Sequence, residues 1–528
     1  MVHALHAVGT LVLLSCLASM QTRAHGPSRR NHADDHVRGG AWIHHEDAGP
    51  CGRDPLRRNC SFAAPHARLL AATDLKLSLP SLVIDHLDVV TVTVQPGAYK
   101  PTSYDWVGVF CVDDEANPPP NKEYLDWHWM TGATDSSLRF GPLINMRCAW
   151  QFRYFTYEGA NAFVKVAESP LVRMRHGPEQ PLHVRVAATC DPTAMRVMWV
   201  SAPVDAPFVE YWEASSNIVR RVNVVERTTY AASDMCEARA TTVASNLFRD
   251  PGIIYSAVLP DLKPEATYSY RIHSGSGKPH SKTFKLRTPP APGVQNGVTS
   301  FFVFGDLGDK TITPPASSKR AATTVELIRR DMSDPRSNYV AVMHDGDLSY
   351  AMGAGYLWDQ FGALIEPVAS EVAYMVAVGN HEYCYMSGGH KDPSGAGATN
   401  GFHPPEGNYG RDSGGECGVP TNKRFIMPDN GNQVFWWSVE MGLVHHTTIS
   451  SEHDYQPGST MYTWLERDLA SVDRSKTPWL FLHLHRPMYT SENYPDDHRV
   501  SLLIRKNLEP LLAKYRVDAV FSGHYHAR

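Results

Sequence analysis

Five short apolar runs in the second half of the chain are each followed by side chains of the kinds that bind metal ions. Runs of this length predict buried parallel strands, and in an open α/β sheet ligands bind beyond the carboxyl ends of the strands. One polar cluster after a strand is usually a turn in which an Asp accepts backbone hydrogen bonds. Five successive clusters instead predict one site at one edge of the sheet. The runs are Ser300–Phe304, Tyr339–Met343, Ala373–Val378, Trp479–Leu484 and Val517–Phe521.

The polar clusters supply the ligand types of a two-metal hydrolase, in which one carboxylate bridges both ions. Carboxylate and phenol oxygens suit a hard, highly charged ion, whereas imidazole and an amide oxygen suit a borderline divalent ion. Glycines directly precede several of these side chains, because a ligand that follows a strand needs a tight turn. The candidate metal ligands are Asp306, Asp347, Tyr350, Asn380, His485, His524 and His526.

Helical patterns alternate with the strands of this region. Apolar residues recur at helical spacing in 319–332 and 461–472, and further helices are expected near 356–365 and 501–515. Alternating strands and helices predict an α/β domain with helices on both faces of the sheet. The Gly-rich stretch 387–430 is too long for a simple connection, and we expect it to line the site.

The first half of the chain instead carries short β-type runs separated by Pro and Gly clusters. This pattern is typical of β-sandwiches, and the spacing of the second set suggests a fibronectin III-like domain. The expected organisation is a signal peptide (1–24), a low-complexity leader (25–74), an N-terminal β-sandwich (75–175), a fibronectin-like domain (176–290) and the α/β domain (298–528).

The N-terminus indicates secretion. Residues 7–20 form an apolar stretch that is too short to span a bilayer and is followed by small residues with a plausible cleavage site after Ala24 or Ala18. Eight cysteines remain if Cys16 leaves with this segment, and an even number permits disulfides whose pairing the sequence leaves open. Asn59-Cys60-Ser61 is a possible glycosylation acceptor.

The charge balance excludes one class of partner. With 50 basic and 55 acidic side chains the formal charge is -5, so no basic surface for nucleic acid is indicated. No run after the N-terminal segment is long and apolar enough for a membrane helix. The oligomeric state is left open by the sequence.

The five blocks resemble the metal-binding blocks of purple acid phosphatases, within the wider calcineurin-like metallophosphoesterase family. Tyr350 is the discriminating residue, because the protein-phosphatase branch continues the second block with Asp-Arg-Gly. The resemblance extends to Asp105–Phe110, Phe248–Gly252 and Trp358–Phe361, so it covers the chain from about residue 75 onward. The family patterns fall on Asp306 (GDxG), Asp347 and Tyr350 (GDxxY), Asn380 and His381 (GNHE), His485 (VxxH), and His524 and His526 (GHxH).

The resemblance implies a four-layer metallophosphoesterase domain with two metal ions. Asp306, Asp347, Tyr350 and His526 would hold Fe(III), and Asp347, Asn380, His485 and His524 would hold Zn, Mn or Fe(II). The implied function is a secreted acid phosphatase that hydrolyses phosphate monoesters with a metal-activated hydroxide, outside the cell or in a vacuolar or lysosome-like compartment. The alternatives are a phosphodiesterase or nucleotide pyrophosphatase using the same centre, and a catalytically weak secreted binding protein.

His381 is the candidate catalytic acid, because it stands beside the ligand Asn380 and can donate a proton to the leaving group. Where many plant members have two adjacent phosphate-binding histidines, this chain has Tyr494 and Pro495, so Tyr494 or His498 is a possible substitute. Leu482 replaces a usual Val without consequence. The chain stops at Arg528, where relatives continue, which suggests a fragment. The candidate substrate contacts are Asn380, His381, His453 and Tyr494.

Overall fold

The computed structural model describes residues 61–62, 74–130, 137–159, 162–216, 218–293, 298–308, 319–334, 337–383, 391–395, 412–491 and 495–526. The expected signal peptide, most of the leader, Cys51, Cys60, Cys384 and Tyr494 lie outside this part of the chain. Within the described residues, no helix is long and apolar enough to cross a membrane.

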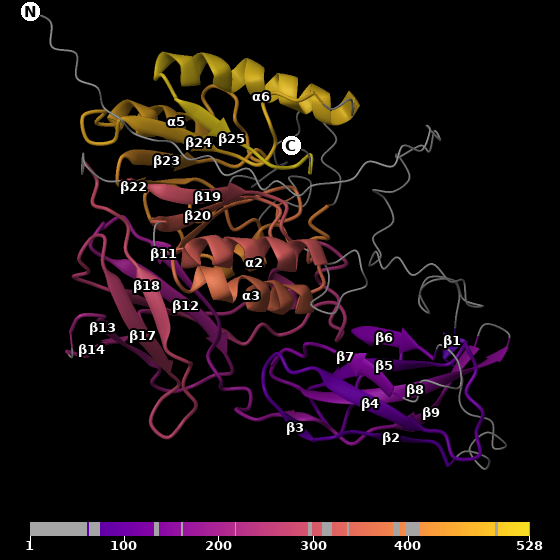
Figure 1. The fold of residues 1–528 in the computed structure, drawn as a ribbon. Helices are drawn as coiled ribbons and strands as arrows, with labels where there is room; N and C mark the ends of the chain where they lie inside the picture. Colours follow the sequence, from indigo (N-terminus) through magenta and orange to yellow (C-terminus); the bar gives the residue numbers. More distant parts are fainter. Residues whose placement is uncertain are drawn as a thin grey trace, which may run out of the picture.

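In the N-terminal β-domain, the described residues include ten strands that form a sandwich-like unit (Figure 1). Its largest sheet has the order β1-β9-β8-β5-β6, and β2-β4-β7 forms a second sheet. Trp106 stacks on Phe155 between adjacent strands, with ring centroids 4.2 Å apart. The strands are β1 (Ser61–Phe62), β2 (Lys76–Ser78), β3 (Val83–Ile84), β4 (Val90–Gln95), β5 (Trp106–Val112), β6 (Asp126–Trp129), β7 (Ser137–Phe140), β8 (Ala149–Gly159), β9 (Ala162–Glu168) and β10 (Arg173–Met174).

A second β-region follows, in which one sheet has the order β14-β13-β17-β18 and the other begins β15-β16-β12-β11. The second sheet does not end at β11, because Val186 of β11 pairs in parallel with Ala373 of the α/β domain. One seven-stranded sheet therefore runs through both regions. The elements are β11 (Leu182–Ala188), β12 (Met195–Ser201), β13 (Phe208–Glu213), β14 (Arg220–Asn223), β15 (Glu226–Thr228), η2 (Ala232–Asp234), β16 (Ile253–Leu259), β17 (Thr267–His273) and β18 (Phe284–Arg287).

The α/β domain has four layers: helices α5 and α6, a four-stranded sheet, the end of the seven-stranded sheet, and helices α2 and α3 (Figure 1). The strands that precede the polar clusters are thus divided between two sheets that face each other. The elements are β19 (Ser300–Phe304), α2 (Lys319–Ser333), β20 (Tyr339–Asp345), α3 (Tyr356–Ala369), β21 (Ala373–Ala377), α4 (Val419–Arg424), β22 (Trp437–Met441), β23 (Val444–Thr448), α5 (Thr460–Ser471), β24 (Trp479–His483), α6 (Pro495–Lys514) and β25 (Ala519–Phe521).

Buried apolar side chains explain why these elements form. Helix α5 buries Met461, Leu465 and Leu469, which recur every four residues on one face, and Ser459 caps it by accepting a hydrogen bond from the Tyr462 amide. Every residue of β20 and of β21 is buried, as expected for strands covered on both faces. The polar side chains that follow these strands are therefore held by a rigid framework.

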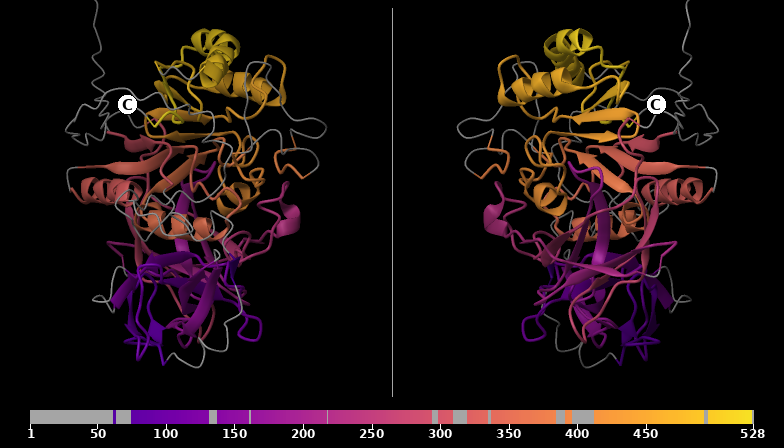
Figure 2. Two further views of the ribbon diagram at one scale, coloured as in Figure 1. Left: turned by 90° about the vertical axis from the view of Figure 1, so that its right-hand side faces the viewer. Right: turned by 90° about the vertical axis from the view of Figure 1, so that its left-hand side faces the viewer.

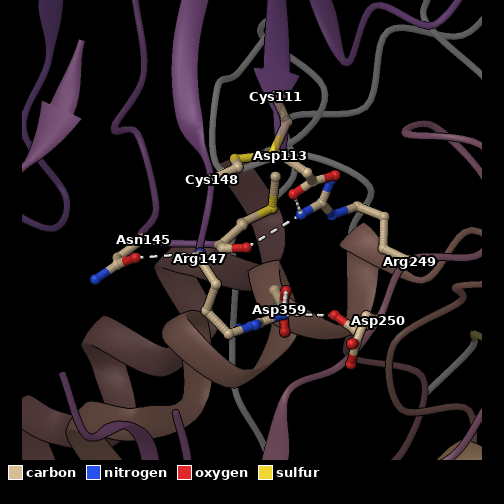
Figure 3. The surroundings of a disulfide bond; sticks show 9 residues. Cys111, Asp113, Asn145, Arg147, Cys148, Arg249, Asp250 and Asp359 are labelled. Carbon is tan, nitrogen blue, oxygen red and sulfur yellow. Dashed lines mark hydrogen bonds and ion pairs between the residues drawn. A yellow bond between two sulfur atoms is a disulfide. The ribbon is translucent and has the colours of Figure 1, made fainter. Parts of the chain in front are cut away.

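The N-terminal domain lies at the end of the molecule opposite α6 (Figure 2), and ion pairs attach it to the rest. The Cys111–Cys148 disulfide lies beside this junction (Figure 3). Close to it, Arg249 makes two hydrogen bonds to Asp113, at 2.8 and 2.9 Å. Arg147 forms a 2.7 Å ion pair with Asp359 of α3, so charged contacts connect the domains.

Candidate metal centre

Three candidate ligands from the ends of three strands meet at one side of the site. The Tyr350 hydroxyl donates a 3.2 Å hydrogen bond to Oδ1 of Asp306 and lies 2.8 Å from Nε2 of His526. Nε2 of His526 is 3.3 Å from the same carboxylate oxygen. A phenol, a carboxylate and an imidazole therefore point their donor atoms at one another, although their residues come from distant parts of the chain.

The other candidate ligands meet beside Asp347. Nε2 of His485 lies 3.2 Å from Oδ2 of Asp347 and 3.0 Å from Oδ1 of Asn380. Ligand atoms of Asp347, His485 and His524 lie within 4.8 Å of one another. Asp347 and His485 are buried, and the carbonyl of Asp345 accepts a 2.9 Å hydrogen bond from Nδ1–H of His485. This bond leaves Nε2 of His485 as the ring nitrogen that faces Asp347 and Asn380 and could bind a metal ion.

The backbone at the site is strained in a consistent way. Asp306, Asp347, Tyr350, His524 and His526 all have positive φ angles, of 59°, 52°, 49°, 81° and 49°. Non-glycine residues rarely adopt this conformation, and such strain gathers at functional sites. Gly379 shows the local crowding, because a Cβ placed there would lie 2.3 Å from Oδ1 of Asp347.

A buried carboxylate, Glu382, holds the turns that carry two of these clusters. It accepts hydrogen bonds from the amides of Asp347, Leu348 and Gly379, at 2.8, 2.7 and 3.0 Å. These amides belong to the turns after β20 and β21, so one side chain fixes both turns. Glu382 thereby determines where the Asp347 carboxylate points.

His381 lies at the mouth of the site with about 20% of its side chain exposed. Its Nδ1–H donates to the carbonyl of Asp412 at 3.2 Å, and its ring centroid is 4.3 Å from that of Tyr350. Nε2 lies 3.8 Å from Oδ2 of Asp347. Because Nδ1 is engaged, Nε2 is the nitrogen that can exchange a proton with a group in the site.

Sequence reasoning missed two residues that hold candidate ligands. Oδ2 of Asp412 accepts a 3.0 Å hydrogen bond from the side-chain amide of Asn380, so the Asn380 oxygen turns toward His485. Asp412 belongs to the long Gly-rich stretch, which gave a general signal for a site-lining loop. Nη1 of Arg486 lies 3.2 Å from Nε2 of His524, and its Nε donates to buried Glu452 at 2.7 Å. The position of Arg486 directly after His485 was its only signal.

The pKa values of the group reflect its close packing. Burial raises the pKa of Asp347, but the charges of His485 and His381 outweigh burial and hold it well below the usual value. Burial lowers the pKa of His485, but the charge of Asp347 and its hydrogen bond raise that pKa to about 10. Burial, together with the charges of Asp347 and Asp306, raises the pKa of Tyr350 well above its usual value. Carboxylates so close together require compensating positive charge.

The donor set fits two metal ions of different character. The group formed by Tyr350, Asp306 and His526 has two anionic oxygen donors, which suit a hard ion such as Fe(III). The group formed by Asn380, His485 and His524 has imidazoles and an amide oxygen, which suit a borderline divalent ion. Asp347 contacts both His485 and the His381 amide, so it lies centrally in the site. The backbone amide of His524 donates to Oδ2 of Asp306 at 2.8 Å, so the two groups are joined into one polar cluster.

The remaining candidate substrate contacts are placed differently. His453 is only 2% exposed, and its ring stacks on Tyr383 with centroids 4.1 Å apart, while its Nδ1 contacts the Ser450 hydroxyl. Burial lowers the pKa of His453 to about 4. This packing inside the protein gives the ring a structural role and argues against substrate contact. His498 is exposed and lines a cleft beside α6, whereas Tyr494 is outside the described residues.

Residues 299–528 match the family described as calcineurin-like phosphoesterase, and residues 181–288 match the purple acid phosphatase N-terminal domain. The chain is 31% identical over 469 residues to probable inactive purple acid phosphatase 9 of Arabidopsis thaliana, covering 81% of this chain and 68% of that protein. It is 34% identical over 253 residues to a nucleotide pyrophosphatase/phosphodiesterase of Hordeum vulgare, covering 47% and 63%. A purple acid phosphatase structure from yellow lupin (Lupinus luteus) seeds superposes with a TM-score of 0.70 at 29% identity, covering 86% of this chain and 80% of that one.

Proposed function

The chain belongs to the purple acid phosphatases, a family of binuclear-metal phosphoesterases, and we propose that it is an active enzyme that hydrolyses phosphate monoesters. The observation that carries the proposal is the convergence of seven donor side chains from strand ends of two sheets. Several relatives, including the Arabidopsis protein above, have names that call them inactive. In this chain each of the seven ligand positions holds a residue able to bind a metal.

We assign Asp306, Asp347, Tyr350 and His526 to Fe(III). We assign Asn380, His485 and His524, with Asp347 shared, to a divalent ion that is Zn, Mn or Fe(II). When bound, the ions would neutralise phosphate charge and supply a nucleophilic water at mildly acidic pH. The protein contributes fixed orientation, because Glu382 holds the turn of Asp347 and Asp412 holds the amide of Asn380.

His381 is the proposed general acid. Its Nδ1–H is engaged with the Asp412 carbonyl, so the proton for the leaving-group oxygen would come from Nε2. The His381 ring packs against Tyr350, and the backbone amide of His381 donates to Oδ1 of Asp347 at 3.0 Å. These contacts hold His381 close to the ligands without occupying the nitrogen that acts. Asn380 and His381 would also contact the substrate phosphate.

Secretion is part of the proposal. Two disulfides, Cys111–Cys148 and Cys236–Cys417, join the described residues, and disulfides persist in oxidising compartments. Together with the apolar N-terminal stretch, they support an extracellular, vacuolar or lysosome-like location. Retention of the expressed full-length protein in the reducing cytosol would contradict this part.

A substrate panel on the metal-loaded full-length protein tests the activity. We expect two metal ions per chain, one of them iron, and hydrolysis of p-nitrophenyl phosphate that is lost in Asp347→Ala. A protein without either metal would overturn the proposal and favour a secreted binding protein. The control is the same preparation stripped of metal.

A second candidate activity is diester or pyrophosphate hydrolysis. The similarity to the nucleotide pyrophosphatase/phosphodiesterase of Hordeum vulgare favours it. The same centre can activate water against either ester. Faster turnover of bis(p-nitrophenyl) phosphate or ATP than of p-nitrophenyl phosphate would select this activity over the first.

A further inference from the structure

A chain of three buried polar side chains crosses between the two facing sheets directly behind the metal centre. Nδ1 of His483, at the end of β24, lies 3.1 and 3.3 Å from the two carboxylate oxygens of Asp345, at the end of β20. Nε2 of His483 lies 3.1 Å from Nδ1 of His446 on β23. All three side chains are at most 2% exposed. The chain therefore joins β20 of one sheet to β24 and β23 of the other.

The two linked strands are the ones that carry Asp347 and His485. Asp347 follows Asp345 by two residues, and His485 follows His483 by two residues. The same Asp345 also accepts the Nδ1–H of His485 through its backbone carbonyl, at 2.9 Å. His485 and Asp347 approach each other to 3.2 Å between β20 and β24. The Asp345–His483 pair connects the same two strands two residues earlier on each.

The two hydrogen bonds that link His446, His483 and Asp345 can both run in the same direction. His446 donates from Nδ1 to Nε2 of His483, and His483 donates from Nδ1 to Asp345. Burial holds the pKa of His446 well below its usual value, so its ring is neutral. Its Nε2 then carries only a lone pair, and among the described residues that atom has no hydrogen-bond partner. An unpaired acceptor costs less than an unpaired buried N–H.

Packing holds the rings in place. His483 stacks on Phe521 of β25 with centroids 5.2 Å apart and planes 17° from parallel. His446 meets Phe301 of β19 edge to face at 4.8 Å. Such a buried polar group is an expensive way to fill a core, because apolar side chains of similar volume are often equally or more stabilising. Its benefit must therefore lie in something other than stability.

We propose that Asp345, His483 and His446 form a positioning strut that sets the distance between β20 and β24, and so presents His485 and Asp347 to the same divalent ion. The inference rests on the proposed function, since it concerns the geometry of that metal site. None of the three side chains would touch substrate. Their effect would reach the reaction through metal affinity.

The decisive variant replaces the polar link by apolar groups, in Asp345→Leu/His483→Phe. The core stays filled, but the Nδ1–H of His446 loses its acceptor, so we expect a folded variant whose melting temperature falls by no more than one unpaired buried N–H would cause. We expect divalent affinity to fall about 10- to 100-fold, as when an outer contact of a ligand is lost. The measurement is calorimetric titration of metal-depleted full-length protein with Zn²⁺, alongside thermal unfolding.

Two single variants test whether the effect on the metal comes from the position of the strands, from the charge of Asp345 or from a general loss of core packing. Asp345→Asn keeps an acceptor for His483, so it should keep Zn²⁺ affinity within about threefold. Tyr374→Phe removes the buried hydroxyl that contacts His344 on the neighbouring strand, so it should lower the melting temperature and leave Zn²⁺ affinity unchanged. Wild-type affinity in the double variant would overturn the strut, as would a loss in Asp345→Asn equal to that of the double variant. Wild-type protein that binds no Zn²⁺ would instead overturn the proposed function.

Discussion

Tyr350 is the residue whose chemistry is most specific in the centre, because a phenolate bound to Fe(III) absorbs visible light. We predict that iron-loaded wild-type protein has a charge-transfer band and that Tyr350→Phe abolishes it. The lost hydroxyl makes two contacts, to Asp306 and His526, so the fold should persist with a cost of about 1–3 kcal/mol. Absorption and circular dichroism spectra provide the measurement. An unchanged visible band in the variant would remove Tyr350 from the ligand set.

Asp412 gives a second prediction at this scale, because its carboxylate orients Asn380 while its backbone carbonyl binds His381. Asp412→Ala should weaken Zn²⁺ binding about 10- to 100-fold, because the Asn380 amide loses its anchor. The His381 contact uses the main chain and should survive, so kcat at saturating metal should stay within about threefold. Asp412→Asn keeps an acceptor and is the matched control. Equal metal affinity in all three proteins would show that Asn380 needs no anchor.

The sequence predicted the side chains that lie in local blocks and missed those that act across space. Asp306, Asp347 and His485 each follow a strand, which gives a signal within a few residues. Asp412 meets Asn380 from 32 positions away, and Asp345 meets His483 from 138 positions away. Contacts at such separations depend on the packing of two sheets, which no local pattern reports. His453 is the opposite case. Its neighbours in sequence are polar and suggested substrate contact, but its ring is packed against Tyr383 and Phe435.

At the scale of elements, the alternation of strands and helices was predicted well because apolar periodicity determines it. The expected helix 461–472 is α5 (Thr460–Ser471), and the expected helix 319–332 is α2 (Lys319–Ser333). The division of the strands between two sheets was not visible in the strand patterns, because a fully buried strand has the same composition in either sheet. The pairing of β11 with β21 was also unforeseen, since it rests on the single pair Val186–Ala373.

Helix α5 is attached to the four-stranded sheet by a charged contact that should respond to pH. Nε2 of His445 on β23 lies 3.2 Å from Asp468 of α5, and Nδ1 lies 3.6 Å from Glu440 of β22. Burial lowers the pKa of His445, but its hydrogen bond to Asp468 and the negative charges of Asp468 and Glu440 outweigh burial and raise that pKa to about 9. A raised pKa in the folded state means that the stabilisation is complete below pH 6.5 and is lost as pH rises through about 9.

We therefore predict that His445→Gln flattens the loss of stability between pH 6.5 and 9. The shift corresponds to about 3 kcal/mol of stabilisation that the wild type has at pH 6 and lacks well above pH 9. The measurement is the urea unfolding midpoint of the wild type and of His445→Gln at several pH values. Taking the difference between the two proteins at each pH removes the contribution of other titrating groups. The same slope in both proteins would exclude His445 as the titrating group.

At the scale of the whole molecule, the N-terminal β-domain is joined to the α/β domain by charges buried at their junction (Figure 3). Asp359 on α3 is 1% exposed and faces Arg147 at 2.7 Å, Arg424 at 3.4 Å and His183 at 3.7 Å. Burial raises the pKa of Asp359, but the charges of Arg147 and Arg424 outweigh burial and lower it to about 2. Burial holds the pKa of His183 well below its usual value, so the cations that Asp359 compensates are Arg147 of the N-terminal β-domain and Arg424 of the α/β domain.

This arrangement predicts that Arg147→Met weakens the junction without changing the metal centre. Removing one partner of a buried pair costs about 3–5 kcal/mol, and the remaining Arg424 should reduce the loss to roughly 2–3 kcal/mol. Arg175→Met is the matched control, because Arg175 and its partner Asp85 are about half exposed and such pairs contribute less than about 1 kcal/mol. Urea unfolding and limited proteolysis of the full-length proteins measure the effect, with metal content as the internal check. Equal midpoints for the two variants would show that Arg147 does not hold the domains together, and loss of metal in Arg147→Met would show that the junction and the site are coupled.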